Sequence, residues 1–171
     1  MRHVDSEFGG SNGLQLTVAR QRLQEAKALA SQLRALAGEA RNLVTESMIG
    51  TEVLDEILIR ATEVEVTERE LEAAIPDIQR AHAIGVNAQQ LRQGILNLGK
   101  DIYRERDTDK KKDLAKRMEV LLEQVSELNS EVEAFPPSNR FIPEHVIIGW
   151  KQDLDSARGV GKRYLAKVNN A

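Results

Sequence analysis

The sequence predicts an all-α fold: an elongated antiparallel bundle of four to five helices with coiled-coil-like heptad packing. Apolar residues make up 41% of the 171-residue chain but aromatic residues only 4%, so the core must be built from Leu, Ile, Val and Ala. Several long stretches repeat their apolar residues every three or four positions, a spacing that only a helix can use. Glycine and proline separate these stretches and indicate where the chain turns.

The composition also limits the class of protein. Residues 1–13 contain glycines and no periodicity, so we expect a flexible lead-in there and a single helical domain over residues 14–171. The chain has no cysteine, which excludes disulfides and Cys-ligated zinc. We find no run of the roughly 18 apolar residues that a membrane-spanning helix needs, and no recognisable signal peptide. The cellular location stays open.

A long helix is predicted over residues 14–48, and it carries two parallel apolar stripes. The second stripe consists of Leu29, Leu36 and Leu43, each seven residues after the one before. A face that wide contacts two neighbouring helices rather than one. Gly50 then provides a stop for the helix. The first stripe consists of Leu16, Ala19, Leu23, Ala26, Ala30, Leu33, Ala37, Ala40 and Val44.

A second helix is predicted over residues 52–75, with Glu68 interrupting its apolar face. Thr67 begins a capping-box pattern, which is consistent with a kink in this helix. Pro76 has no N–H to donate and crowds the preceding turn, so we expect the helix to end before it. The chain then forms a short helix over residues 76–84.

Two further helices are predicted over residues 87–106 and 108–135. Asn87 is a suitable N-cap for the first of them. Two interpretations compete at their junction, because Asp107 can cap a new helix after a turn, or one helix can run through. Heptad continuation of the earlier stripe does not arrive at Leu114, where the next stripe begins, so we expect the turn.

The stretch 114–135 carries the clearest heptad seam in the chain. Valine at one core position and leucine at the other favour a parallel two-stranded coil, which supports a homodimer. The wide face of residues 14–48 also needs neighbours, so we expect this seam to be an intramolecular core, with dimerisation as the alternative. The seam residues are Leu114, Met118, Leu121, Val125, Leu128, Val132 and Phe135.

A last helix is predicted over residues 143–168, after a Pro-Pro pair that ends the preceding one. Pro143 suits its first turn. Gly149, Gly159 and Gly161 weaken this helix and mark places where another backbone packs close.

Charge is distributed unevenly among these segments. Residues 51–75 hold eight acidic and two basic residues, whereas residues 136–171 hold three acidic and six basic ones. Complementarity within the chain is the simplest explanation, and a whole-chain net charge of −3 argues against a dedicated nucleic-acid binder. The acidic face consists of Glu63, Glu65, Glu68, Glu70 and Glu72. The basic residues that could contact a partner or an anion are Lys151, Arg158, Lys162, Arg163 and Lys167.

No reactive constellation is recognisable in the sequence. None of the histidines, His3, His82 and His145, has a glutamate three residues before it, which removes the Glu-x-x-His signature of di-iron bundles. The segment around Gly161 and Lys162 lacks the hydroxyl residue and the preceding strand of a phosphate-binding loop. We therefore predict no catalytic residues, no cofactor and no metal site.

The functional prediction is a non-enzymatic interaction or assembly module that presents helix faces to a protein partner. Many apolar residues lie at the spacings of packed helices and no reactive motif is recognisable, and both observations favour this class. The alternative is an anion-binding or nucleic-acid-binding module that uses the basic last helix, and salt would discriminate the two because phosphate contacts weaken as ionic strength rises.

Overall fold

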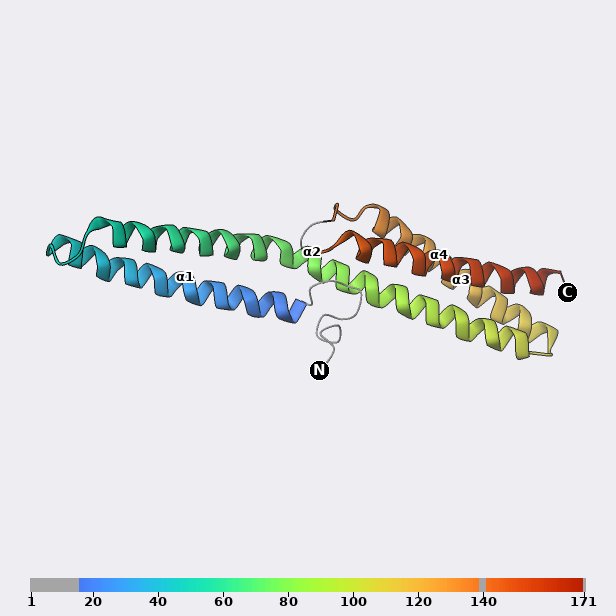
Figure 1. Cartoon of the computed structure of the whole chain (residues 1–171). Helices are drawn as coiled ribbons and strands as arrows, with labels where there is room; N and C mark the ends of the chain where they lie inside the picture. Colours follow the sequence, from blue (N-terminus) through green and yellow to red (C-terminus); the bar gives the residue numbers. More distant parts are fainter. Residues whose placement is uncertain (1–15, 139–140, 171) are drawn as a thin grey trace, which may run out of the picture. The chain divides into compact units, whose positions relative to one another are not determined.

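The fold is described from a computed structural model of the whole chain, in which residues 16–138 and 141–170 are placed well enough to describe. These residues form four helices and no strand (Figure 1). The all-helical prediction is therefore confirmed for this part of the chain. The predicted lead-in at residues 1–13 lies outside the described residues.

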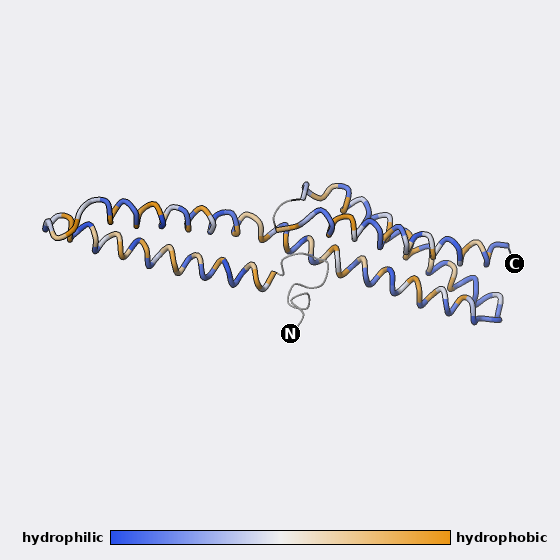
Figure 2. Tube along the Cα trace, viewed as in Figure 1, coloured by the Kyte–Doolittle hydropathy of each residue, from blue (hydrophilic) through white to orange (hydrophobic). Residues whose placement is uncertain are grey.

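The four helices are α1 (Leu16–Thr45), α2 (Thr51–Arg104), α3 (Thr108–Glu133) and α4 (Glu144–Asn169). Hydrophobic and hydrophilic segments alternate along each of them (Figure 2), as expected for helices with one apolar side.

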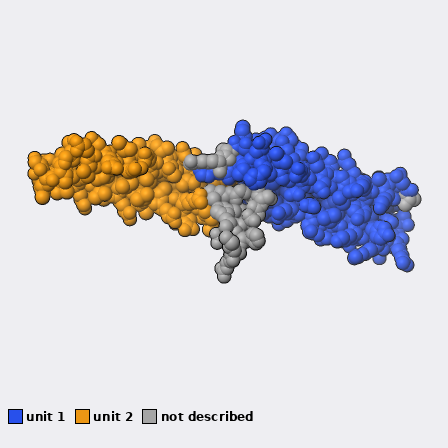
Figure 3. All heavy atoms as spheres, viewed as in Figure 1, with its two compact units in different colours: residues 1–13, 80–171 blue, residues 14–79 orange. Residues whose placement is uncertain are grey.

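The described chain divides into two compact units, shown in different colours in Figure 3. Unit 2 holds residues 16–79, which are α1 and the first part of α2. Unit 1 holds residues 80–138 and 141–170, which are the rest of α2 with α3 and α4. The prediction of one domain over residues 14–171 stays a prediction.

Unit 2 is an antiparallel helical hairpin. Arg34 of α1 pairs with Glu65 of α2, and Lys27, seven residues earlier, pairs with Glu72, seven residues later. Because the residue numbers rise on one helix as they fall on the other, the two helices run in opposite directions. The core between them is alanine-rich, which lets the helix backbones approach closely. Its buried apolar residues are Ala19, Ala30, Ala37, Ala40, Ala61, Leu71 and Ile78.

The turn of this hairpin is formed by a residue that the sequence did not single out. The N–H of Met48 donates to the carbonyl of Leu43, and the N–H of Ser47 donates to that of Val44. Ser47 has a φ of 59°, the left-handed conformation that such a helix stop requires. The first helix therefore ends at Thr45, before the glycine stop that the sequence indicated.

The predicted break at Pro76 is wrong, because α2 continues through it from Thr51 to Arg104. The predicted helices 52–75, 76–84 and 87–106 are one element, and Asn87 lies inside it rather than at its N-cap. Thr67 does not start a new helix either, since its hydroxyl donates to the carbonyl of Glu63 within α2. The apolar side continues without a change of phase through Leu71, Ile78, Ala81, Ile84, Ala88, Ile95 and Ile102, which are all buried.

Unit 1 is a three-helix bundle in which α2 and α4 run parallel and α3 runs opposite to both. Gly94 of α2 faces Leu121 of α3, and Arg92 of α2 pairs with Asp153 of α4. The expected turn before α3 is confirmed, because Asp107 accepts hydrogen bonds from the N–H groups of Asp109 and Lys110. This side-chain cap is the one that the sequence suggested.

The predicted seam of α3 lies in the core of this bundle. Met118 and Val125 are fully buried, and Val132 and Leu128 are nearly so. The chain thus covers most of this seam with its own helices, as predicted. Phe135 lies at its end, with its ring edge-to-face against Trp150 of α4 at 5.2 Å between ring centres.

The glycines of α4 differ in their surroundings, which gives a test of the packing. A Cβ on Gly161 would lie 2.7 Å from Cδ2 and 3.2 Å from Cγ of Leu122, whereas one on Gly159 would meet nothing within 4 Å. Both Gly→Ala changes gain the same helix propensity, roughly 1 kcal/mol. We expect Gly159→Ala to raise the free energy of unfolding, measured in urea. We expect the Gly161→Ala variant to be about 1–3 kcal/mol less stable than the Gly159→Ala variant in the same measurement. Equal stability of the two variants would contradict the close approach of α3 and α4.

Candidate functional site

The acidic face predicted on residues 63–72 is divided between two sides of unit 2. Glu65 and Glu72 lie on one side and pair with Arg34 and Lys27 of α1. Glu63 lies on the other side, beside an open groove, and pairs with Arg60 at 3.3 Å. The residues that the sequence predicted as one acidic face therefore have different neighbours in the structure.

The remaining two acidic residues differ from this pattern. Glu68, which interrupts the apolar face, is half-buried, and Glu70 is exposed and has a contact within the chain.

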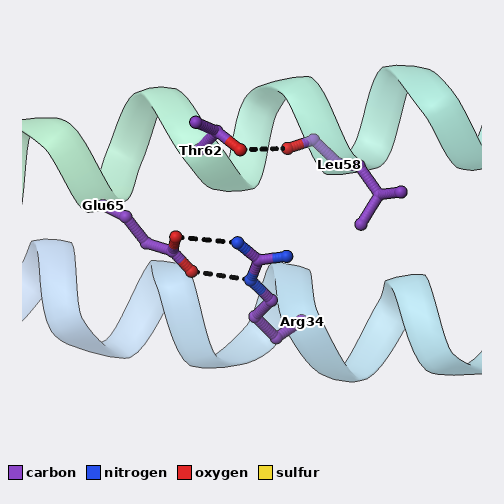
Figure 4. Close-up of polar contacts among 4 residues, drawn as sticks. All are labelled: Arg34, Leu58, Thr62 and Glu65. Carbon is purple, nitrogen blue, oxygen red and sulfur yellow. Dashed lines mark hydrogen bonds and ion pairs between the residues drawn. The ribbon is translucent and has the colours of Figure 1, made fainter.

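The best-defined polar contact is the one between Arg34 and Glu65. The Nε and Nη2 atoms of Arg34 donate to the two carboxylate oxygens of Glu65, at 2.6 and 2.7 Å (Figure 4). On α2 nearby, the hydroxyl of Thr62 donates to the carbonyl of Leu58. The hydrogen bonds from Arg34 hold the pKa of the Glu65 carboxyl below its ordinary value of 4.5, and they raise the pKa of Arg34.

This shift predicts a pH dependence of stability. Because the pKa of Glu65 is lower in the folded state, its pairing stabilises the fold above the ordinary carboxyl pKa, and that contribution disappears as the pH falls through the folded value. We expect Glu65→Gln to be less stable than the wild type at neutral pH and to approach it in acid, in melting temperatures measured from pH 7 downward. Glu39→Gln, on an exposed residue within α1 of the same unit, is the control. A constant difference across this range would contradict the assignment.

The basic residues predicted on the last helix do not converge on one site. Lys151 pairs with Glu133 of α3 at 3.6 Å, and Arg158 pairs with Asp155 at 3.8 Å. The other contacts stay within the helix. Arg163 donates from Nε to the carbonyl of Gly159, Lys167 lies 5.9 Å from the ring centre of Tyr164, and Lys162 is exposed.

Unit 2 has a groove on its surface with a largely apolar lining. It lies between α1 and α2 and has a volume of about 460 Å³. Leu29 is on its wall, and its side chain is 46% exposed, as are 47% of Leu36 and 37% of Leu43 further along α1. The residues that line the groove are Arg22, Glu25, Ala26, Leu29, Glu63, Val64, Thr67 and Leu71.

The leucine stripe was visible in the sequence as the second stripe of the first helix, but the groove was not. The sequence predicted that so wide a face contacts two neighbours, whereas in unit 2 only α2 packs against it. Leu29, Leu36 and Leu43 are therefore apolar residues that the described part of the chain covers only in part.

Unit 1 also has shallow grooves along α2 and α3. One, of about 400 Å³, is lined by Asn87, Leu91 and Leu128 among others, and another, of about 450 Å³, by Gly94, Leu98 and Val120. None of these residues was among the predicted site residues. The signal was present in the spacing of Leu91 and Leu98, which lie seven residues apart on one side of α2.

Within the described ranges, no three His, Asp or Glu side chains lie close enough together to hold a metal ion. His82 and His145 are both exposed, and His3 lies outside those ranges. None of the four helices as described is long and apolar enough to cross a lipid bilayer.

Comparisons with protein-family models, with curated proteins and with solved structures found no match to this chain.

Proposed function

We propose that this protein is a non-enzymatic interaction or assembly module that binds a protein partner through helix faces. The observation that carries this proposal is the exposed stripe of Leu29, Leu36 and Leu43 beside the groove of unit 2. A contiguous apolar strip on a helix, bordered by charged residues, is typical of a protein–protein contact. Its seven-residue spacing supports coiled-coil-like packing against the partner.

The alternative, an anion-binding or nucleic-acid-binding module, is favoured less by the arrangement of the basic residues. Lys151 and Arg158 already pair with carboxylates, and the grooves described above on units 1 and 2 are lined by none of the basic residues of α4. A homodimer is a second hypothesis, in which the partner is another copy of this chain, and the solution mass of the chain distinguishes it.

The test compares how much partner protein is retained by the tagged full-length wild type and by a variant whose three stripe leucines are replaced. We expect the triple variant Leu29→Ser, Leu36→Ser, Leu43→Ser to keep its helical circular dichroism, because these side chains are exposed, and to retain at least about tenfold less partner. Ile148→Ser, at a similarly exposed apolar residue of α4, is the control. Unchanged retention by the triple variant would refute this function for the stripe.

A further inference from the structure

The helix α1 carries two heptad seams that share residues. The buried seam faces α2, and the second seam begins at the groove, which Ala26 and Leu29 line. Ala26, Leu33 and Ala40 belong to both, so the second seam is wider than the three exposed leucines. Read along the chain, it consists of Ala26, Leu29, Leu33, Leu36, Ala40 and Leu43, with spacings of three and four residues throughout.

The opposite wall of the groove is formed by α2 and has matching apolar residues. Val64 and Leu71 line the groove directly, and Ile57 lies seven residues before Val64 on the same side of the helix. Val53, which is 48% exposed, extends this line towards the hairpin turn. Two parallel apolar walls with a channel between them form the seat that a third helix occupies in a three-helix bundle.

Unit 1 shows what such a seat looks like when it is filled. There the pair formed by α2 and α3 is covered by α4, which buries Trp150, Leu154 and Ala157 against it. In unit 2 the pair formed by α1 and α2 has no third helix among the described residues. The stripe from Leu29 to Leu43 covers 15 residues and rises about 21 Å along the helix, so a partner helix of three heptads, about 31 Å long, is long enough to cover it.

The edges of the groove carry a surplus of negative charge. Glu25 and Glu63 line it directly. Glu39 follows Glu25 by two heptads, and Glu56 lies one heptad before Glu63, so seven-residue spacing places them along the same edges. The basic residues beside the groove are Arg22, which lines it, and Arg60, which pairs with Glu63.

This charge pattern selects among the helices that could bind. In a two-fold dimer the same surface meets itself, so a second copy would bring acidic edges against acidic edges. Like charges at the edges of a helical seam oppose pairing, whereas Lys or Arg at those positions favour it. On the opposite side of unit 2, Glu65 and Glu72 are paired with Arg34 and Lys27.

We infer that the groove between α1 and α2 of unit 2 binds an amphipathic helix of a partner protein whose apolar stripe is flanked by lysine or arginine. This inference rests on the function proposed above and specifies the chemistry of the partner. The apolar walls provide the contact area, and the acidic edges select basic flanks and orient the helix.

The test uses the full-length chain and fluorescein-labelled synthetic helices of 21 residues. One peptide has leucine at alternating spacings of three and four with lysine at the flanking positions, and a second has glutamate at those flanking positions. In fluorescence anisotropy we expect the lysine peptide to bind at least about tenfold more tightly than the glutamate peptide, because several edge pairs act together. Its affinity should fall as salt rises, since these pairs are exposed.

Two variants of the chain separate groove binding from general attraction to an acidic protein. Leu36→Asp adds negative charge yet removes apolar contact, so we expect it to bind the lysine peptide at least about tenfold more weakly. The double variant Glu39→Lys, Glu56→Lys should bind the lysine peptide more weakly and the glutamate peptide more tightly than the wild type does. The controls are Ile148→Asp on α4 and the double variant Glu119→Lys, Glu123→Lys on α3, and neither should change either affinity.

Three results would overturn the inference. Equal binding of both peptides would mean that the edges do not select charge, although the groove could still serve another partner. A solution mass of twice 19.1 kDa that Leu36→Asp reduces to the monomer would mean that a second copy occupies the groove. An affinity for the lysine peptide that Leu36→Asp leaves unchanged would mean that the peptide does not bind in the groove. The proposed function is tested by a different result. If it were wrong, the triple serine variant would retain every partner that the wild type retains.

Discussion

The variant Val125→Asp is expected to unfold unit 1. The side chain of Val125 is fully buried in α3, so an aspartate there would be a carboxylate without water or a partner. Such a burial costs several kcal/mol, which is comparable to the whole stability of a typical domain of about 5–15 kcal/mol. We therefore expect a large fall in helical circular dichroism and in melting temperature.

The single tryptophan of the chain reports on this change directly. Trp150 is 2% exposed and lies in unit 1, so its fluorescence should shift to the red when that unit unfolds. Val120→Asp is the matched control, because Val120 lies on the same helix and is 53% exposed, and it should leave the emission unchanged. If Val125→Asp instead keeps its helicity while a dimer becomes a monomer, the seam is an interface between chains.

The sequence predicted the later helices well because their signals are local and strong. Asp107 caps α3 through its own side chain, and the Pro-Pro pair after Phe135 ends it within two residues of the predicted boundary. The predicted last helix, 143–168, differs from α4 by one residue at each end. Caps and prolines outside a helix act on their immediate neighbours, so no tertiary information was needed.

The sequence failed where a local signal opposed a long-range one. Pro76 argues for a break, but the buried residues from Leu71 to Ile102 keep one phase along α2. Each of those residues gains burial only if the helix continues, and their sum outweighs one missing hydrogen bond. That constant phase was visible in the sequence and was the signal to follow.

The candidate site could be predicted only in part, for a related reason. Periodicity places Leu29, Leu36 and Leu43 on one side of a helix, and it showed that this side needed a neighbour. Periodicity does not show which residues of the neighbouring helix lie beside each carboxylate. Glu65 and Glu63 are two residues apart, yet one pairs across the hairpin with Arg34 and the other borders the groove. That difference depends on the register of α1 against α2, which no local pattern determines.

The variant Pro76→Ala is expected to stabilise the protein strongly. Pro76 lies inside α2, where it leaves the carbonyl four residues earlier without its usual donor and crowds that turn. Proline in a helix interior is about 3 kcal/mol less favourable than alanine, so the substitution should raise the free energy of unfolding by up to about that amount. For a chain of this size we expect a rise in melting temperature of roughly 6–12 °C.

The control for this prediction is Pro137→Ala, at an exposed proline between α3 and α4. Both substitutions loosen the unfolded chain and lose about 0.4–1 kcal/mol by that route, so the difference between them isolates the term from the helix. If the helix instead broke before residue 76, as the sequence pattern suggested, proline would occupy a favourable first-turn position. Pro76→Ala would then be as destabilising as Pro137→Ala in urea unfolding, and the continuous helix from Thr51 to Arg104 would be wrong.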